Sequence, residues 1–329
     1  MTETRNSIVI TRRLIALIGL ALAPLVSGAR TSAQPQRDAA EEYTLKLNAN
    51  MVILSATVLD HHNSLVSGLS KDDFQIYEDG ALQQIKNFTH EDIPVTAGIV
   101  VDNSGSMGPK RSDVITAALA FAQSSNPQDQ MFVVNFNEHV SLGLPADTPF
   151  TDRKDQLQLA LSRIQPAGQT ALYDAIAVAL DHLRQGTSDK KVLIVISDGG
   201  DNASKQTLAQ VIAKARQSAA IIYAIGIYDD QDPDQNPDAL KRFARQTGGE
   251  AFFPESSKDI PSICEGIARD IRNQYTLTYV PTIASQDGKY RAIEVKAEAH
   301  GRGRLSVRTR AGYSVPSNTT AIGSADVRP

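Results

Sequence analysis

Residues 97–106 read Ala-Gly-Ile-Val-Val-Asp-Asn-Ser-Gly-Ser, an apolar run that ends in oxygen-bearing side chains. The run predicts a strand buried on both faces, and a helical pattern follows it. In open α/β sheets the loops at the carboxyl ends of the strands form the binding crevice, so we expect Asp102, Ser104 and Ser106 to lie there. One carboxylate and two hydroxyls at alternate positions of a tight turn, which Gly105 allows to fold sharply, are ligands that a hard cation prefers.

The alternation of apolar strands and helical patterns continues to about residue 272. Continuous apolar strands separated by helices indicate a mostly parallel sheet with helices on both faces, in the manner of a Rossmann-like α/β fold. The expected strands are Ala97–Val101, Met131–Phe136, Val192–Ile196 and Ile221–Ile227. The expected helices are Val114–Gln123, Lys154–Ile164, Ala171–Leu183, Leu208–Ala219, Pro237–Gln246 and Ile260–Arg272.

Both flanks of this block alternate between polar and apolar residues, which predicts β-strands. Neither flank has enough strands to bury a core alone. We therefore expect one small all-β sandwich made from residues 43–92 and 273–315, with the α/β domain, 93–272, inserted in it. The expected flanking strands lie at 44–47, 51–59, 74–78, 275–280, 290–297 and 305–309. Asp79-Gly80 predicts a turn before a further short strand, and Asp287-Gly288 predicts a hairpin turn.

The N-terminus resembles an export signal. Arg12 and Arg13 precede an apolar run, Leu14–Val26, and small residues end at Ala33, where we expect cleavage of a signal peptide, 1–33. The run is short for a membrane-spanning helix and no second one occurs. We expect a secreted or periplasmic protein, with a disordered linker at 34–42 and a disordered tail at 316–329.

Composition excludes some classes of function. The net charge of -4 and the pI near 5.9 leave no basic surface to neutralise nucleic-acid phosphates or anionic lipid. The single cysteine, Cys264, lies far from the cleavage region, so neither a disulfide framework nor a lipoprotein anchor is expected. Its neighbours, Ile263 and Ile267, indicate a buried small hydrophobe.

Two further oxygen-bearing residues occupy matching positions downstream. Thr170 precedes a helical pattern after a Pro/Gly loop, and Asp198 follows the strand expected at Val192–Ile196. With the D-x-S-x-S of residues 102–106, the order resembles the metal-ion-dependent adhesion site of von Willebrand factor A and integrin A domains. The resemblance covers about residues 93–272, and the flanks look like those of a bacterial exported family of von Willebrand factor A-related proteins. It implies the metal ligands Asp102, Ser104, Ser106, Thr170 and Asp198.

The resemblance also implies a mechanism. Ser104 and Ser106 would bind Mg²⁺ directly, and Mn²⁺ would fit equally well. Asp102 and Asp198 would act largely through waters or hydrogen bonds, and an Asp or Glu of a protein partner would complete the octahedron. Thr170 would bind the ion directly in one state and through a water in another, which would link partner binding to movement of the closing helix Ile260–Arg272.

No catalytic apparatus is recognisable. The sequence lacks G-x-S-x-G, a phosphate-binding loop, G-x-G-x-x-G and H-E-x-x-H, and its six histidines are scattered. We expect no enzyme but a binding module. The alternative is a structural subunit of an envelope or extracellular assembly whose metal only stabilises the fold, and a third class is an enzyme with the metal as Lewis acid.

Two features near the motif have plainer interpretations. The acidic stretch 229–238 suggests a calcium loop, but it lacks the sixth-position Gly and has Lys241 at the twelfth position, so we expect a solvated loop. Asp201 and Asn202 either line the metal face or form a turn and helix cap.

Overall fold

The computed structural model describes residues 51–228, 233–283 and 288–315. Several features expected from the sequence lie outside these ranges. They are the signal peptide at 1–33, the linker at 34–42, the strand at 44–47, the first part of the acidic stretch at 229–232, Asp287 of one turn, and the tail at 316–329.

The central sheet has six strands within the described residues, in the order β10-β9-β8-β5-β6-β7. Every pairing is parallel except that of β7 with β6. All eight residues of the central strand β5 are buried, as its apolar sequence predicts. The bounds are β5 Val95–Asp102, β6 Gln130–Phe136, β7 Val140–Leu142, β8 Lys190–Ser197, β9 Ile221–Gly226 and β10 Ala251–Phe252.

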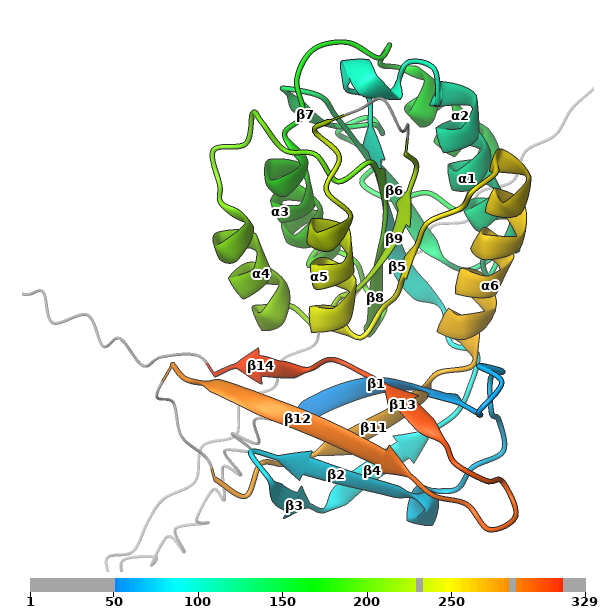
Figure 1. Ribbon diagram of the computed structural model, residues 1–329, viewed down its shortest axis with the longest axis vertical. Helices are drawn as coiled ribbons and strands as arrows, with labels where there is room; N and C mark the ends of the chain where they lie inside the picture. The colour runs from blue at the N-terminus through cyan, green and yellow to red at the C-terminus, as the bar shows by residue number, and fades with distance from the viewer. Residues whose placement is uncertain (1–50, 229–232, 284–287, 316–329) are drawn as a thin grey trace, which may run out of the picture. The chain divides into compact units, whose positions relative to one another are not determined.

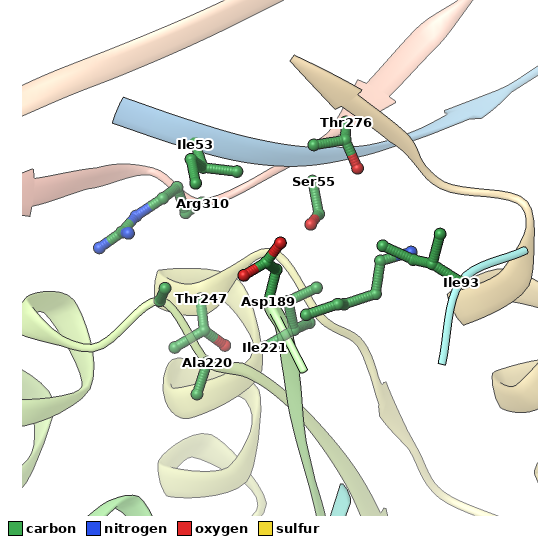
Figure 2. Close-up of a pocket in the computed structure, with 11 residues that line it drawn as sticks. Ile53, Ser55, Ile93, Asp189, Ala220, Ile221, Thr247, Thr276 and Arg310 are labelled. Carbon is green, nitrogen blue, oxygen red and sulfur yellow. The ribbon is translucent and has the colours of Figure 1, made fainter. Parts of the chain in front are cut away.

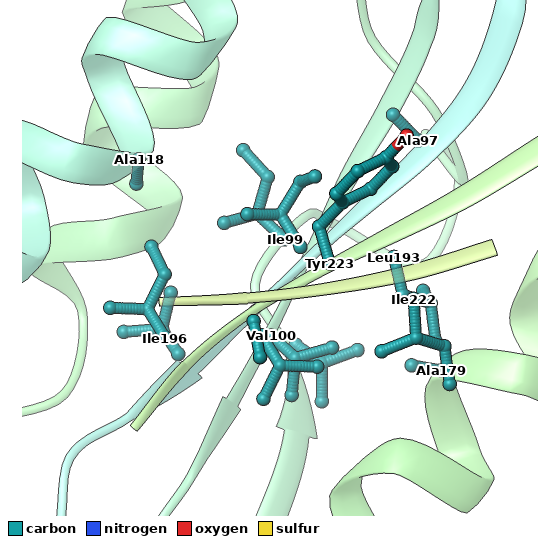
Figure 3. Packing of buried hydrophobic residues seen from close by; sticks show 14 of the residues in the cluster. Ala97, Ile99, Val100, Ala118, Ala179, Leu193, Ile196, Ile222 and Tyr223 are labelled. Atoms are coloured by element: carbon teal, nitrogen blue, oxygen red, sulfur yellow. The ribbon is translucent and has the colours of Figure 1, made fainter. Parts of the chain in front are cut away.

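Helices cover both faces of this sheet (Figure 1). One layer contains α1 (Arg111–Ser124), α2 (Lys154–Ser162) and α6 (Ile260–Arg272), and the other contains α3 (Leu172–Leu183), α4 (Leu208–Gln217) and α5 (Pro237–Thr247). Successive residues of β5 point to opposite faces of the sheet and pack against different helical layers. In Figure 3, Ile99 lies on the side of Ala118 and Val100 on the side of Ala179. None of the helices in the described ranges is long and apolar enough to span a membrane.

The flanks combine into two antiparallel sheets of four strands each in the described part of the chain. Strand β1, before the α/β block, pairs with β11 after it, and β2 pairs with β12 in the same way. Buried residues of both sheets share one core. The bounds are β1 Val52–Leu59, β2 Phe74–Glu78, β3 Ala81–Gln83, β4 Ile85–Thr89, β11 Tyr275–Tyr279, β12 Tyr290–Ala297, β13 Ser306–Arg308 and β14 Gly312–Ser314. The predicted fold class, an α/β domain with additional sheets from its flanks, is confirmed.

The sequence pattern does not predict four of the described strands, β4, β7, β10 and β14. Each lies at the end of its sheet in the strand order. Edge strands are commonly short and carry few apolar residues, which leaves a weak alternation to detect.

Asp270, near the end of α6, joins the α/β domain to the sandwich. Its buried carboxylate accepts hydrogen bonds of 2.6 Å from the Thr57 hydroxyl of β1 and of 2.6 Å from the Tyr223 hydroxyl of β9. Arg308 of β13 forms ion pairs with Asp270 and with Glu250. A buried carboxylate is tolerated where several donors and a cation satisfy it, so this network fixes the C-terminal end of α6.

Candidate metal centre

The D-x-S-x-S segment lies where the sequence predicts it, immediately after β5. Asp102 ends the strand, a 3₁₀ turn spans Gly105–Met107, and α1 begins at Arg111. The carboxylate of Asp102 accepts a hydrogen bond of 2.9 Å from the Ser104 backbone N–H, which folds the segment back on itself. The hydroxyl oxygens of Ser104 and Ser106 are 3.2 Å apart. Three of the predicted ligands therefore come from one tight turn.

Asp198 joins this turn from the neighbouring strand β8. The Ser106 hydroxyl donates a hydrogen bond of 2.8 Å to Oδ2 of Asp198. In return the Ser197 hydroxyl donates a hydrogen bond of 2.6 Å to Oδ2 of Asp102. Because β5 and β8 are adjacent and parallel, with Val101 opposite Ile196, their carboxyl ends meet at the same edge of the sheet. The structure brings four of the five predicted residues into one hydrogen-bonded group.

Thr170 lies in an adjacent loop. The Gly105 N–H donates to the Gly168 carbonyl at 3.0 Å, and the Ala167 N–H donates to the Asn103 carbonyl at 3.0 Å. These bonds hold the Thr170 loop against the D-x-S-x-S turn, although no hydrogen bond among the described residues joins the Thr170 hydroxyl to the other four. Thr170 is buried, at 7% exposure. Thr170 therefore lies next to the hydrogen-bonded group, and the described bonds of that group do not include its hydroxyl.

The electrostatics of the group favour a cation. Burial, and next the charge of the nearby Asp198, raise the pKa of Asp102 to about 7. Asp102 and Asp198 are 1% and 2% exposed, so neither charge is relieved by water. The cation recorded within ion-pair distance of Asp198 is Lys110, whose Nζ lies 3.9 Å from Oδ2 of Asp198. A positive ion between these side chains would remove the repulsion that raises the pKa of Asp102.

The donor set fits a hard divalent cation. Hydroxyl and carboxylate oxygens are the ligands that Mg²⁺ and Mn²⁺ prefer. Across the described ranges no three His, Cys, Asp or Glu side chains come together in an arrangement that could hold a metal. The hydroxyls of Ser104 and Ser106 lie beside the Asp198 carboxylate and add oxygen atoms to the group. Ser106 is half-buried and the adjoining Gly105 is exposed, so the group opens to solvent.

A profile of the von Willebrand factor type A domain family matches residues 98–265, which is more than half of the 329 residues. The chain belongs to this family. The resemblance predicted from the residues at 102–106, 170 and 198 is confirmed. Proteins of the family generally serve as adhesion and binding modules, and they commonly bind a divalent metal at this motif.

The chain is also similar to several solved structures, at low identity. A von Willebrand factor type A protein from Catenulispora acidiphila is 12% identical, with a TM-score of 0.48, over 85% of this chain and 78% of its own. Proximal thread matrix protein 1 of the mussel byssus is 16% identical, with a TM-score of 0.48, over 59% and 51%. The domain of the type V pili tip protein Mfa5 from Porphyromonas gingivalis is 14% identical, with a TM-score of 0.46, over 55% and 95%. At these identities and TM-scores, the similarities support no conclusion about the partners of this chain.

Two residues that the sequence did not single out, Ser197 and Glu138, support the group in this von Willebrand factor A domain. Ser197 donates to Asp102, as described above, and Glu138 accepts a hydrogen bond of 2.9 Å from the Gln169 N–H. Asn202, which the sequence did single out, accepts one of 2.9 Å from the Thr170 N–H through its side-chain oxygen. Ser197 immediately precedes Asp198, so proximity to the motif is a signal that could have found it. Glu138 carries no such signal.

Asp201 and Asn202 have the plainer of their two interpretations, that of a turn and helix cap. Asp201 accepts hydrogen bonds from the Tyr173 N–H at 3.0 Å and from the Ser204 hydroxyl at 2.6 Å, at the start of α3. The Asn202 N–H also donates to the Thr170 carbonyl at 2.9 Å. Both residues therefore hold the first turn of α3 and, through it, the position of Thr170.

The described part of the acidic stretch packs beside the centre. The Asn236 N–H donates to the Asp198 carbonyl at 3.0 Å, and its side chain caps α5 by accepting from the Ala239 N–H at 3.1 Å. Gly199 has a φ of +81°, and a Cβ there would lie 2.2 Å from the Asn236 carbonyl oxygen. Only glycine allows this approach. Asp234 and Asp238 are exposed, as expected of a solvated loop.

A small cavity elsewhere in the molecule is distinct from the centre. Its volume is about 60 Å³, and Figure 2 shows Ser55 and Thr276 of the sandwich facing Asp189 and Ile221 across it. Its lining includes the first residues of β8 and β9, so it lies at the opposite end of the sheet from Asp198. The cavity adjoins the junction of the sandwich and the α/β domain, and its lining residues are not those of the candidate metal centre.

His182 and Cys264 are buried, as the sequence predicted for Cys264. His182 is buried against Phe132 and Phe150, and its Nε2 lies 2.9 Å from the Pro149 carbonyl oxygen. Burial raises the pKa of the Cys264 thiol to about 12, which keeps it protonated and unreactive.

Proposed function

We propose that this chain is an exported binding module that recognises an acidic residue of a protein partner through Mg²⁺ at a metal-ion-dependent adhesion site. The proposed ligands are Asp102, Ser104, Ser106, Thr170 and Asp198, and Mn²⁺ is a proposed substitute. We propose that residues 1–33 direct export and are then removed. We propose that the mature protein consists of a linker at 34–42, the sandwich at 43–92 and 273–315, the α/β domain at 93–272 and a tail at 316–329.

One observation carries the proposal. Two buried carboxylates lie at the ends of adjacent strands, and each accepts a hydrogen bond from a serine of the other's loop: Asp102 from Ser197 at 2.6 Å and Asp198 from Ser106 at 2.8 Å. Such a group has excess negative charge and few hydrogen-bond donors to balance it. Its carboxylate and hydroxyl oxygens suit the capture of a hard cation.

The protein's own residues would orient and tune the centre. Ser197 and the Ser104 N–H hold the two oxygens of Asp102 in place. The oxygens of Ser104 and Ser106 carry no charge, so a divalent ion held through them keeps positive charge for an incoming carboxylate. Asn202 and Glu138 hold the Thr170 loop at a fixed position beside the turn.

A matched pair of fluorescent peptides tests the binding proposal. One contains a single Glu among glycines and the other has Gln in its place, and both have an amidated C-terminus and an uncharged fluorophore, so that the Glu side chain is their single carboxylate. We expect the Glu peptide to bind in Mg²⁺ and not in EDTA, and the Gln peptide to bind in neither. The Asp102→Ala protein serves as the control and should bind neither peptide. Equal binding of both peptides, or binding of the Glu peptide that EDTA leaves unchanged, would contradict the proposal.

A structural subunit is the second candidate, because the Asp270 and Arg308 network ties the α/β domain to the sandwich. In that case the metal would only stabilise the fold. It predicts that Asp102→Ala lowers the melting temperature measured in Mg²⁺ and leaves assembly contacts intact below that temperature. Loss of Glu-peptide binding by a variant that melts normally would favour the binding module instead.

A further inference from the structure

Lys110 places a buried ammonium group beside the candidate metal centre. The residue lies just before α1, and its side chain is 8% exposed. Nζ of Lys110 is 3.9 Å from Oδ2 of Asp198. This nitrogen has no hydrogen-bond partner among the described residues.

The ammonium group of Lys110 lacks hydrogen-bond acceptors among the described residues. A lysine ammonium has three N–H donors, and burying it without acceptors is costly. The distance to Asp198 is too long for a hydrogen bond, and the same carboxylate oxygen already accepts a bond of 2.8 Å from Ser106. The neighbouring cation Arg111 is engaged elsewhere, since it donates to the Asn103 side chain at 2.8 Å. Lys110 is therefore a buried positive charge without a hydrogen-bond acceptor in the part of the chain that the structure describes, and it lies next to a proposed metal ligand.

We propose that Lys110 makes metal binding at this centre depend on a carboxylate, and this inference rests on the proposed function. Without a metal, the ammonium balances the charge of Asp198. A divalent ion at the centre must share Asp198 with Lys110, so the two cations repel each other and the ion binds weakly. An incoming carboxylate supplies both the missing negative charge and the acceptors that Lys110 lacks.

The expected consequence is reciprocal cooperativity. If a carboxylate tightens metal binding by some factor, the metal must tighten carboxylate binding by the same factor. Lys110 is then a residue that determines specificity for an anionic partner, because a neutral side chain would leave two buried positive charges facing each other. The chain would hold little metal until an acidic partner arrives.

Calorimetric titration of Mg²⁺, with and without saturating acetate, tests this inference. Acetate is the probe because it has the carboxylate and nothing else. For the wild type we expect acetate to tighten Mg²⁺ binding several-fold. For Lys110→Met we expect Mg²⁺ binding without acetate to be about tenfold tighter than in the wild type, as removal of a like charge in a partly buried site requires. The effect of acetate should nearly vanish in this variant.

Two further variants separate charge from folding. Lys110→Arg keeps the charge and should behave as the wild type does. Lys154→Met removes the same charge from an exposed position at the start of α2 and should also match the wild type. Circular dichroism establishes that each variant folds, and Lys110→Gln replaces Lys110→Met if the latter does not.

Two outcomes overturn the inference in different ways. If Lys110→Met binds Mg²⁺ as the wild type does, with the same response to acetate, the metal centre stands and the role of Lys110 is wrong. If neither protein binds Mg²⁺ with acetate present, the centre itself fails and the inference fails with it.

Discussion

Ser106 and Asp198 are joined by a hydrogen bond of 2.8 Å although 92 positions separate them in the chain. The bond links the loop after β5 to the loop after β8. Two adjacent parallel strands therefore deliver a hydroxyl and a carboxylate to one point, and the Ser197 to Asp102 bond connects the same two loops in the opposite direction. This reciprocal pairing is the basis of the predictions that follow.

Replacement of Ser106 should separate metal binding from stability. Ser106→Ala removes a proposed ligand and leaves the fold, because the residue is half-buried at the mouth of the loop. We expect Mg²⁺ affinity to fall by at least about tenfold, with metal-free stability within about 1 kcal/mol of the wild type. Calorimetry and urea denaturation measure the two quantities. Ser112→Ala, at an exposed position of α1, should change neither.

The stabilisation that Mg²⁺ gives should grow with pH. The pKa of Asp102 is raised to about 7 in the folded protein from 3.8. A raised pKa means that this group stabilises the metal-free fold below about pH 4 and that the contribution is lost as the pH rises through about 7. Mg²⁺ requires the ionised carboxylate, so melting curves should show a larger shift with Mg²⁺ at pH 8 than at pH 5. An equal shift at both pH values would contradict this. Asp102→Asn removes the titrating group and provides the control.

Asp270 should matter more for stability than any exposed acid. Asp270→Ala leaves Arg308 and the hydroxyls of Thr57 and Tyr223 without their shared acceptor. Removal of one partner from a buried ion pair costs roughly 3–5 kcal/mol, and we expect a loss of that size in urea denaturation. Asp238→Ala, whose side chain is 88% exposed, should change the free energy of unfolding by less than about 0.5 kcal/mol. If Asp270→Ala loses as little free energy of unfolding as Asp238→Ala does, the network does not stabilise the fold.

Gly168 should be required for the position of the Thr170 loop. Its φ is +77°, and a Cβ there would lie 1.6 Å from Oε2 of Glu138, which accepts from the Gln169 N–H. Gly168→Ala should lower the free energy of unfolding by about 1 kcal/mol and weaken Mg²⁺ binding, since it strains the loop and displaces Glu138. Gly266→Ala is the matched control. It lies in α6 with nothing within 4 Å of the added Cβ, and alanine there should stabilise the helix by about 0.5–1 kcal/mol.

The sequence predicted the α/β domain well because its signals are long and repeated. The bounds of α6 and β12 agree with the predicted Ile260–Arg272 and Tyr290–Ala297. The pairing of β1 with β11 followed from a physical argument, namely that neither flank can bury a core alone. The edge strands β7 and β10 were missed because they have three and two residues and present little pattern.

The five candidate ligands could be proposed from the sequence, whereas the nearby residues Glu138 and Lys110 could not. The motif and two downstream oxygens follow strand ends or precede a helix, so topology alone brings Asp102 and Asp198 together. The contribution of Glu138 depends on the fold of the β6–β7 turn, and that of Lys110 on the path of the chain before α1. Neither path has a local sequence signal. The ligand roles of all five residues stay predictions. The structure joins Asp102, Ser104, Ser106 and Asp198 by hydrogen bonds, and the described bonds leave the Thr170 hydroxyl apart from them.

Calorimetric titration of Mg²⁺ and Mn²⁺ into the chelator-stripped mature protein, with Asp102→Ala in parallel and acetate present, tests the central claim most directly. The account predicts saturable binding at one site in the wild type and none in Asp102→Ala. Absence of binding by the wild type with acetate present, or equal binding by the two proteins, would contradict it.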